Sequence, residues 1–188
     1  MKTLPRLAAL VLVAAPLVAG AGCKRPKHVR VASFTPPPPR AGFVERSGSG
    51  WRVSVPSTWR DASQGDAGAW ALVDPQAADD FHAKVIVVTE PFAGESYDYA
   101  RASEAGLRRE QRASVEAPRE DVIDGDPTLI LETHWAPGPS GAVPFRTMQT
   151  ALASRGTGYV VTCSVSVNAF ESYRSTCESI LRSFAVER

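Results

Sequence analysis

Hydrophobic and polar residues alternate along most of the chain after residue 50, and this pattern predicts a domain built largely of β-strands. Most of the alternating runs end near a proline, glycine or aspartate, which are residues typical of turns. Short connections such as Asp124-Gly125 favour tight hairpins, so the later strands are expected to form an antiparallel meander. The expected strands cover residues 51–56, 69–73, 82–89, 115–123, 128–135, 145–154 and 159–167.

The third of these strands departs from strict alternation. Residues 85–88 read Val-Ile-Val-Val, and successive side chains of a strand point to opposite faces of the sheet. Both faces of this strand are therefore expected to be buried, which requires a covering layer on each side. The sequence thus predicts an α+β fold, with an antiparallel sheet of about six to seven strands flanked by helices on both faces.

Two helices are expected to supply these layers. The first runs from Ser96, which is suited to cap it, to about Arg112. The second follows the last strand, where Asn168 and Glu171 have the spacing of a capping box. Its apolar residues recur at helical spacing: Phe170, Tyr173, Cys177, Ile180, Leu181 and Phe184.

The same periodicity places Cys163 and Cys177 on the core-facing sides of the last strand and the last helix. Cys163 lies about 16 Å of strand before Asn168, and Cys177 lies about 14 Å of helix after it. If the helix folds back over its own strand, the two sulfur atoms meet. We therefore predict a disulfide between Cys163 and Cys177; two buried thiols are the alternative.

The N-terminus has the three parts of a secretory signal peptide, expected at residues 1–22. Lys2 and Arg6 form the positive flank, residues 7–18 form the apolar stretch, and small residues follow. A membrane-spanning helix needs about 20 predominantly apolar residues. This run is interrupted by Pro16, so a retained anchor helix is the weaker interpretation.

Cys23 directly follows the small residues, and Ala21-Gly22-Cys23 resembles the lipobox at which bacterial lipoproteins are cut and acylated. This resemblance predicts lipidation of Cys23 and attachment to the membrane. Lys24 after the cysteine resembles the outer-membrane sorting pattern of enterobacterial lipoproteins. The alternative is ordinary cleavage after Ala19-Gly20-Ala21, which would release a soluble protein into the periplasm.

Residues 23–50 do not have the composition of a packed domain. The segment carries a basic cluster, four consecutive prolines at 36–39, and Ser47-Gly-Ser-Gly50. Polyproline is an extended spacer and Gly/Ser sequences are flexible ones, so this segment is expected to be a tether. Residues 51–188 then form one globular domain.

Composition excludes one broad class of function. The full chain has 21 Lys and Arg against 20 Asp and Glu, and removal of residues 1–22 takes away Lys2 and Arg6, which leaves 19 against 20. This near-neutral balance has no basic footprint of the kind that binds nucleic acid, so no nucleic-acid partner is expected.

Several short motifs resemble one family. Gly50-Trp-Arg-Val-Ser-Val-Pro-Ser-Thr-Trp59 is similar to the opening of PsbP-like domains, and Tyr159-Val-Val-Thr-Cys163 and Ile180-Leu-Arg-Ser-Phe184 are similar to their last strand and helix. The match covers residues 50–188 and points to the bacterial lipoprotein branch of the LpqN and DcrB type. The resemblance implies an antiparallel sheet between helices and a protein that binds or stabilises other proteins.

No catalytic set accompanies this domain, and no cofactor is expected. His82, Glu132 and His134 are the residues that could join in a metal-dependent or hydrolytic enzyme, because Glu132 and His134 share a strand face. Two histidines that are not part of a dense cluster of metal ligands are more often solvated, so an enzyme of this kind remains the alternative. A further alternative is a small-molecule carrier with a pocket between the sheet and a helix.

The sequence therefore predicts a non-enzymatic binding or assembly domain in the cell envelope. Its expected attachments are the membrane, through the lipid on Cys23, and an unidentified protein partner. Its expected location is the outer membrane, facing the periplasm.

Overall fold

The computed structural model describes residues 40–63, 69–137 and 143–188. The expected signal peptide, Cys23 and most of the expected tether lie outside these residues. The described elements are β1 (Phe43–Gly48), β2 (Trp51–Pro56), β3 (Arg60–Asp61), β4 (Ala69–Ala78), β5 (Phe81–Pro91), α1 (Ser96–Leu107), β6 (Ala113–Val115), β7 (Arg119–Ile123), β8 (Asp126–Trp135), β9 (Phe145–Ser154), β10 (Thr157–Ser166), α2 (Phe170–Arg182) and β11 (Ala185–Val186).

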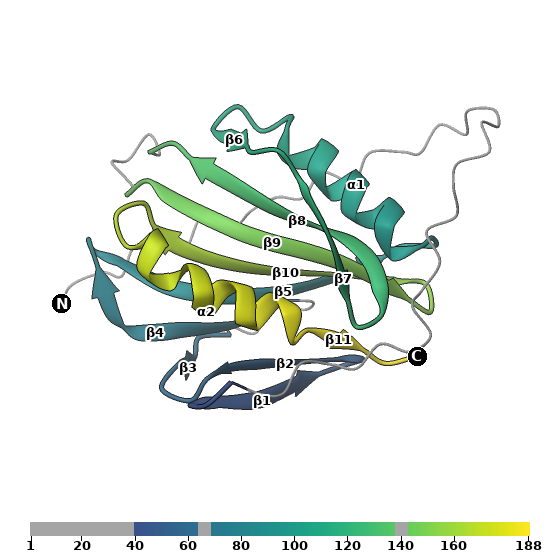
Figure 1. The fold of residues 1–188 in the computed structure, drawn as a ribbon, viewed down its shortest axis with the longest axis horizontal. Coiled ribbons are helices and arrows are strands. Elements are labelled where there is room, and N and C mark those ends of the chain that lie inside the picture. The colour runs from purple at the N-terminus through teal and green to yellow at the C-terminus, as the bar shows by residue number, and fades with distance from the viewer. Residues whose placement is uncertain (1–39, 64–68, 138–142) are drawn as a thin grey trace.

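The strands form two antiparallel sheets (Figure 1). The larger has eight strands in the order β3-β4-β5-β10-β9-β8-β6, with β7 paired to β8 beside this path. The smaller has three strands in the order β1-β2-β11. The expectation of six to seven strands was too low for the large sheet. The two-residue strand β3 is too short to show an alternating pattern, and the expected strand 115–123 is divided into β6 and β7. The expected strand 51–56 is β2 and lies in the small sheet.

Each face of the large sheet has a covering layer, but the expected burial of both faces at residues 85–88 holds for one face only. Val85 and Val87 are buried in the main hydrophobic core, whereas Ile86 and Val88 on the opposite face are half-buried and belong to neither hydrophobic cluster. On one face α1 packs against β8 and β9. On the other face α2 packs against β10 and β9, and β2 of the small sheet packs against α2 (Figure 1). The α+β fold with a helix on each face is therefore confirmed, with the small sheet as an added part of one layer.

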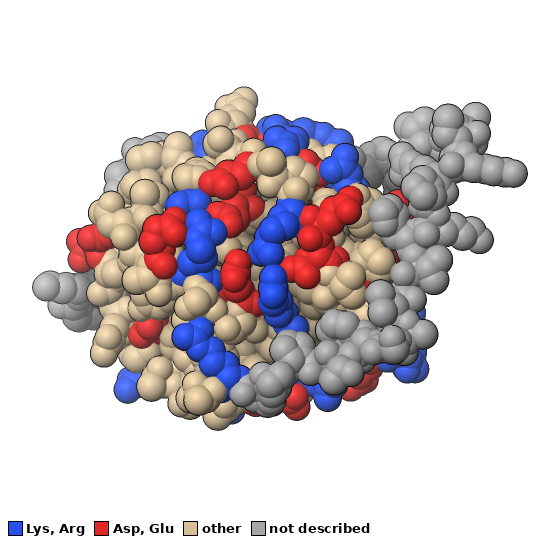
Figure 2. Space-filling model, in the orientation of Figure 1, with Lys and Arg blue, Asp and Glu red and all other residues tan. Residues whose placement is uncertain are grey.

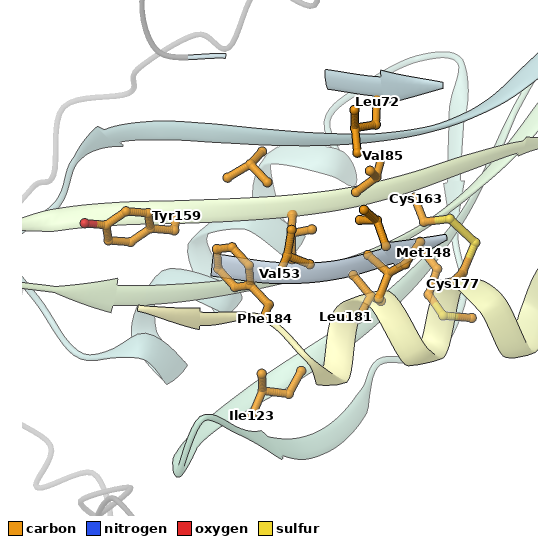
Figure 3. Packing of buried hydrophobic residues seen from close by; sticks show 14 of the residues in the cluster. Val53, Leu72, Val85, Ile123, Met148, Tyr159, Cys163, Cys177, Leu181 and Phe184 are labelled. Carbon is orange, nitrogen blue, oxygen red and sulfur yellow. A yellow bond between two sulfur atoms is a disulfide. The ribbon is translucent and has the colours of Figure 1, made fainter. Parts of the chain in front are cut away.

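The main hydrophobic core lies between the large sheet, α2 and the small sheet (Figure 3). Strand residues such as Val85, Val161 and Met148 contribute from the large sheet, and Val53 contributes from β2. A second, smaller cluster lies under α1 and contains Tyr99, Ala100, Leu129, Leu131, Ala151, Ala153 and Val160.

Three hairpins of the large sheet turn through residues with positive φ. The β9–β10 turn uses Arg155 and Gly156, and the β7–β8 turn uses Asp124 and Gly125, as the Asp-Gly pattern predicted. The β4–β5 turn uses Asp79 and Asp80. Strand β4 continues past Asp74-Pro75, where a strand end was expected, because a register shift between Val73 and Ala77 accommodates the interruption.

The helix boundaries differ from the predictions in their capping residues. Helix α1 is capped by Glu95, whereas Ser96 was the expected capping residue. The helix ends at Leu107, before the expected end at about Arg112. Ser96 is buried, and its hydroxyl donates to Asp126 Oδ2 at 2.7 Å. Helix α2 follows Ala169 and has no side-chain cap, so the capping box of Asn168 and Glu171 was wrong.

The expected boundary between tether and domain was also wrong. Residues 43–48 form β1 and pair with β2 from Phe43↔Pro56 to Gly48↔Trp51. The Gly/Ser sequence that suggested a flexible linker instead contains the β1–β2 turn. Gly50 has a φ of +79°, which favours glycine at this position.

Candidate functional site

Glu132 and His134 lie on β8, on the face of the sheet that α2 covers. Alternation along the strand places them on the same face as Ile130, which belongs to the main core. They are therefore close to each other, as the sequence indicated.

His82 lies elsewhere. It belongs to β5, and β10 and β9 separate this strand from β8, a distance of about 14 Å at ~4.8 Å per strand. Its neighbour Ala83 faces the main core, so His82 points to the opposite face. His82 Nδ1 instead lies 2.8 Å from the carbonyl oxygen of Asp74. The three residues expected to join in an enzyme or metal site are not brought together.

Glu132 is held by two arginines. Its Oε2 accepts from Arg146 on β9 at 3.0 Å, and its Oε1 accepts from Arg174 on α2. Arg146 also donates to Glu171 at 3.1 Å and to Glu116 at 2.9 Å. We call these residues, together with His134, the α2 charge network: Glu116, Glu132, His134, Arg146, Glu171 and Arg174.

The two arginines of the network share an aromatic base. The guanidinium carbon of Arg146 lies 4.0 Å from the centre of the Phe170 ring, and that of Arg174 lies 4.9 Å from it. Such cation–π contacts hold both side chains over the start of α2. Hydrogen bonds to Glu171 and Glu132 raise the pKa of Arg174, so it stays charged.

The network also fixes the charges of its acids. A hydrogen bond from His134 Nε2 to Glu116 Oε1, at 2.6 Å, lowers the pKa of Glu116. Arg174 lowers the pKa of Glu171 in the same way. Among the described residues, the Nε of Arg146 is a buried polar atom without a hydrogen-bond partner.

A second set of ion pairs joins α2 to β7. Arg119 contacts Glu178 at 3.2 Å, and Arg182 contacts Asp121 at 3.2 Å. Figure 2 shows the result as interleaved positive and negative side chains across this side of the molecule. We call the exposed surface of α2 with both sets of ion pairs the α2 face.

The charges of the α2 face are compensated within the domain. Each charge named above already has a partner of opposite sign, so the surface does not present one uncompensated charge. Within the described residues no group of three or more His, Cys, Asp or Glu side chains is arranged to hold a metal ion. Also within these residues, no helix is long and apolar enough to cross a membrane.

A disulfide fixes α2 beneath this face. Cys163 on β10 and Cys177 on α2 are joined, with their Cα atoms 5.6 Å apart (Figure 3). Both residues are completely buried. The bond joins the middle part of α2 to β10.

No family model and no curated protein matches this chain. Solved structures do match. The cyanobacterial PsbP protein of Synechocystis aligns with 82% of this chain and 98% of its own length, at a TM-score of 0.54 and 14% identity. The chain has a PsbP-like fold.

Two further solved structures resemble this PsbP-like chain. LpqN of Mycobacterium tuberculosis, a protein involved in cell envelope biogenesis, covers 78% of this chain and 90% of its own at a TM-score of 0.57 and 10% identity. PA94 of Pseudomonas aeruginosa, a protein of unknown function, aligns with 79% of this chain and 99% of its own length, at a TM-score of 0.52 and 14% identity. These similarities establish the fold of the PsbP-like domain and leave its function to be argued from its own residues.

Sequence reasoning found only part of this site. It selected Glu132 and His134 because they are two residues apart on a strand. It missed Arg146 and Arg174, which come from different elements. Glu171 and Arg174 are three residues apart on the exposed side of a helix, a spacing that could have indicated an ion pair. Nothing in the local sequence marks Arg146.

Proposed function

We propose that this protein is an envelope lipoprotein whose PsbP-like domain binds a protein partner through the α2 face. Lipid on Cys23 attaches it to the membrane, facing the periplasm from the outer membrane, and the domain works without catalysis. The signal-like N-terminus supports the first part of the proposal. The α2 face is the observation that carries the second.

The α2 face has three properties of a recognition surface. Arginine is enriched in protein interfaces, and this face presents Arg119, Arg174 and Arg182 with exposed fractions of 45%, 34% and 47%. Ion pairs already order these side chains, so a partner restricts little further freedom. Alternating signs favour one orientation of a complementary surface.

Photo-crosslinking in the native host tests partner binding. A benzophenone amino acid replaces Ser172, which is exposed on α2. A matched variant carries the same group at Arg109, an exposed residue just beyond α1. We expect one product of defined mass from position 172 and none of that mass from position 109. The same products from both positions, or none from position 172, would contradict the proposal.

Charge reversal then tests whether the ion-pair pattern is recognised. Arg119→Glu combined with Arg182→Glu reverses two exposed charges and leaves the residues of the α2 charge network unchanged. We expect the product from position 172 to disappear while thermal unfolding stays close to that of the parent protein. A product that persists would show that the charges of the face are structural only.

Intact mass of the membrane-extracted protein tests the anchor. We expect a chain that begins at Cys23 and carries the added mass of acyl groups, and a Cys23→Ser variant that moves to the soluble fraction. A chain that begins at another residue and is soluble would contradict the lipid anchor without affecting the partner test.

A further inference from the structure

A cavity of about 430 Å³ lies between the large sheet and the β1–β2 turn. It is separate from the α2 face and does not depend on the proposed function. A volume of several hundred Å³ is typical of small-molecule sites. The cavity is lined by Gly48, Ser49, Trp51, Ala69, Trp70, Val87, Thr89, Thr157 and Tyr159.

Three aromatic rings form its walls. The rings of Trp51 and Trp70 lie 4.9 Å apart at 59° to each other. Tyr159 comes from β10, and Figure 3 shows its hydroxyl directed away from the other labelled core residues. Trp51 and Tyr159 are 5% and 6% exposed, whereas Trp70, which also lines the cavity, is half-buried.

Two glycines make this arrangement possible. A Cβ atom on Gly48 would lie 2.4 Å from the Trp51 ring, and one on Gly50 would lie 2.6 Å from the Tyr159 hydroxyl. The turn therefore approaches the aromatic rings more closely than any other residue type allows.

Three polar side-chain groups of the cavity make no hydrogen bond within the described part of the chain. No hydrogen bond there joins the Tyr159 hydroxyl or the indole N–H groups of Trp51 and Trp70 to another side chain or to the backbone. None of these three groups is among the buried polar atoms without a partner, so they are open to the solvent that fills the cavity. These donors, with the hydroxyls of Thr89 and Thr157, are available to a ligand.

The lining also carries no Asp, Glu, Lys, Arg or His. A charged ligand group would lose water without gaining a counter-charge, which costs free energy. An alkyl chain would leave the hydroxyls and indole N–H groups unused. An uncharged ring with C–H faces and hydroxyl edges fits both features, because its C–H faces pack on the negative faces of aromatic rings.

We propose that this cavity binds a neutral saccharide unit, with Trp70 as the stacking residue and Thr89, Thr157 and Tyr159 as hydrogen-bonding residues. The purified full chain, in a detergent without a sugar head group, tests this. The probes are maltotriose and triacetylchitotriose, followed by saturation-transfer difference NMR and tryptophan fluorescence. We expect binding of at least one of them at millimolar concentration or below.

Variants locate the binding. Trp70→Ala should weaken it by about tenfold or more, and Trp70→Phe should retain most of it because a ring remains. Thr157→Val should weaken binding severalfold. The matched control is Thr162→Val, which changes the same residue type on the same strand outside the cavity and should have no effect.

Three outcomes would overturn the proposal. One is the absence of binding by both saccharides at millimolar concentration. Another is binding that Trp70→Ala leaves unchanged while that variant remains folded. The third is Trp70-dependent binding of laurate or phosphocholine without binding of either saccharide. That result would assign the cavity to an acyl chain or a cationic head group.

Discussion

Gly48 and Gly50 show how the role of a residue depends on what packs against it. In the sequence they belong to Ser47-Gly-Ser-Gly50, which suggested a flexible linker. In the structure Gly50 takes a φ of +79° in a tight turn, and a Cβ atom on either glycine would clash with an aromatic side chain. Local composition could not distinguish these roles, because both favour glycine.

Gly50→Ala is expected to destabilise the domain by about 2–4 kcal/mol, since it combines left-handed backbone strain with a clash against Tyr159. The matched control is Gly156→Ala. Gly156 has a similar φ of +78° in another hairpin turn but has nothing within 4 Å of its Cβ position. The control should lose only about 1–2 kcal/mol. Chemical denaturation measures both, and equal losses would show that the clash is absent.

Tyr173 links α2 to β4 by a hydrogen bond from its hydroxyl to Asp74 Oδ2 at 2.8 Å. Burial and this hydrogen bond raise the pKa of Tyr173 from 10.0 to about 12. The unfolded chain loses this proton near pH 10 and the folded chain near pH 12. The resulting stability is thus fully present below pH 10 and is lost as the pH rises towards 12.

Tyr173→Phe should remove this part of the alkaline pH dependence. Thermal unfolding is measured for both proteins from neutral pH up to about pH 12. We expect the parent protein to lose more stability than the variant as the pH rises above 10. Parallel pH profiles would contradict the assignment, whatever the difference between the two proteins at neutral pH.

At the scale of elements, α2 was the best-predicted part of the chain. Its apolar residues recur at helical spacing, and the distances along strand and helix placed Cys163 opposite Cys177. The N-terminal cap was wrong because Asn168 has the right residue type but lies one position before the residue that precedes the helix. The ion pairs that hold α2 to β7 and β9 were missed, because their partners are far apart in the sequence.

Removal of the disulfide by the double change Cys163→Ala and Cys177→Ala should destabilise the domain. The two cysteines are 14 residues apart, and closing a loop of this length contributes about 3 kcal/mol in the chain-entropy model. Denaturation of the parent protein with and without a reducing agent supplies the control. The reductant should lower the parent's stability and leave the double variant unchanged. A double variant as stable as the oxidised parent would contradict this.

At the scale of the whole molecule, the two layers that cover the large sheet differ in the size of their hydrophobic clusters. The main cluster joins the large sheet, the small sheet and α2, and a disulfide crosses it. The cluster under α1 is smaller, and α1 contributes only Tyr99 and Ala100 to its buried hydrophobic residues. Local opening is easier where fewer apolar contacts must be broken.

Hydrogen exchange monitored by mass spectrometry should therefore show two levels of protection. Amides of α1 are expected to exchange through a partial opening, at a lower free energy than those of β10 and α2. The contrast should decrease in the double cysteine variant, because α2 loses its covalent tie. Equal protection of both helices in the parent protein would indicate that the layers open together.

The sequence by itself determined the periodic elements: the long strands, the two helices and the pairing geometry of Cys163 with Cys177. These follow from side-chain periodicity, which each segment carries locally. Only the tertiary structure decided the pairing of β1 and β11 with β2, the separation of His82 from Glu132, the α2 charge network and the aromatic cavity. Each of these depends on which distant segments become neighbours, and no local pattern records that.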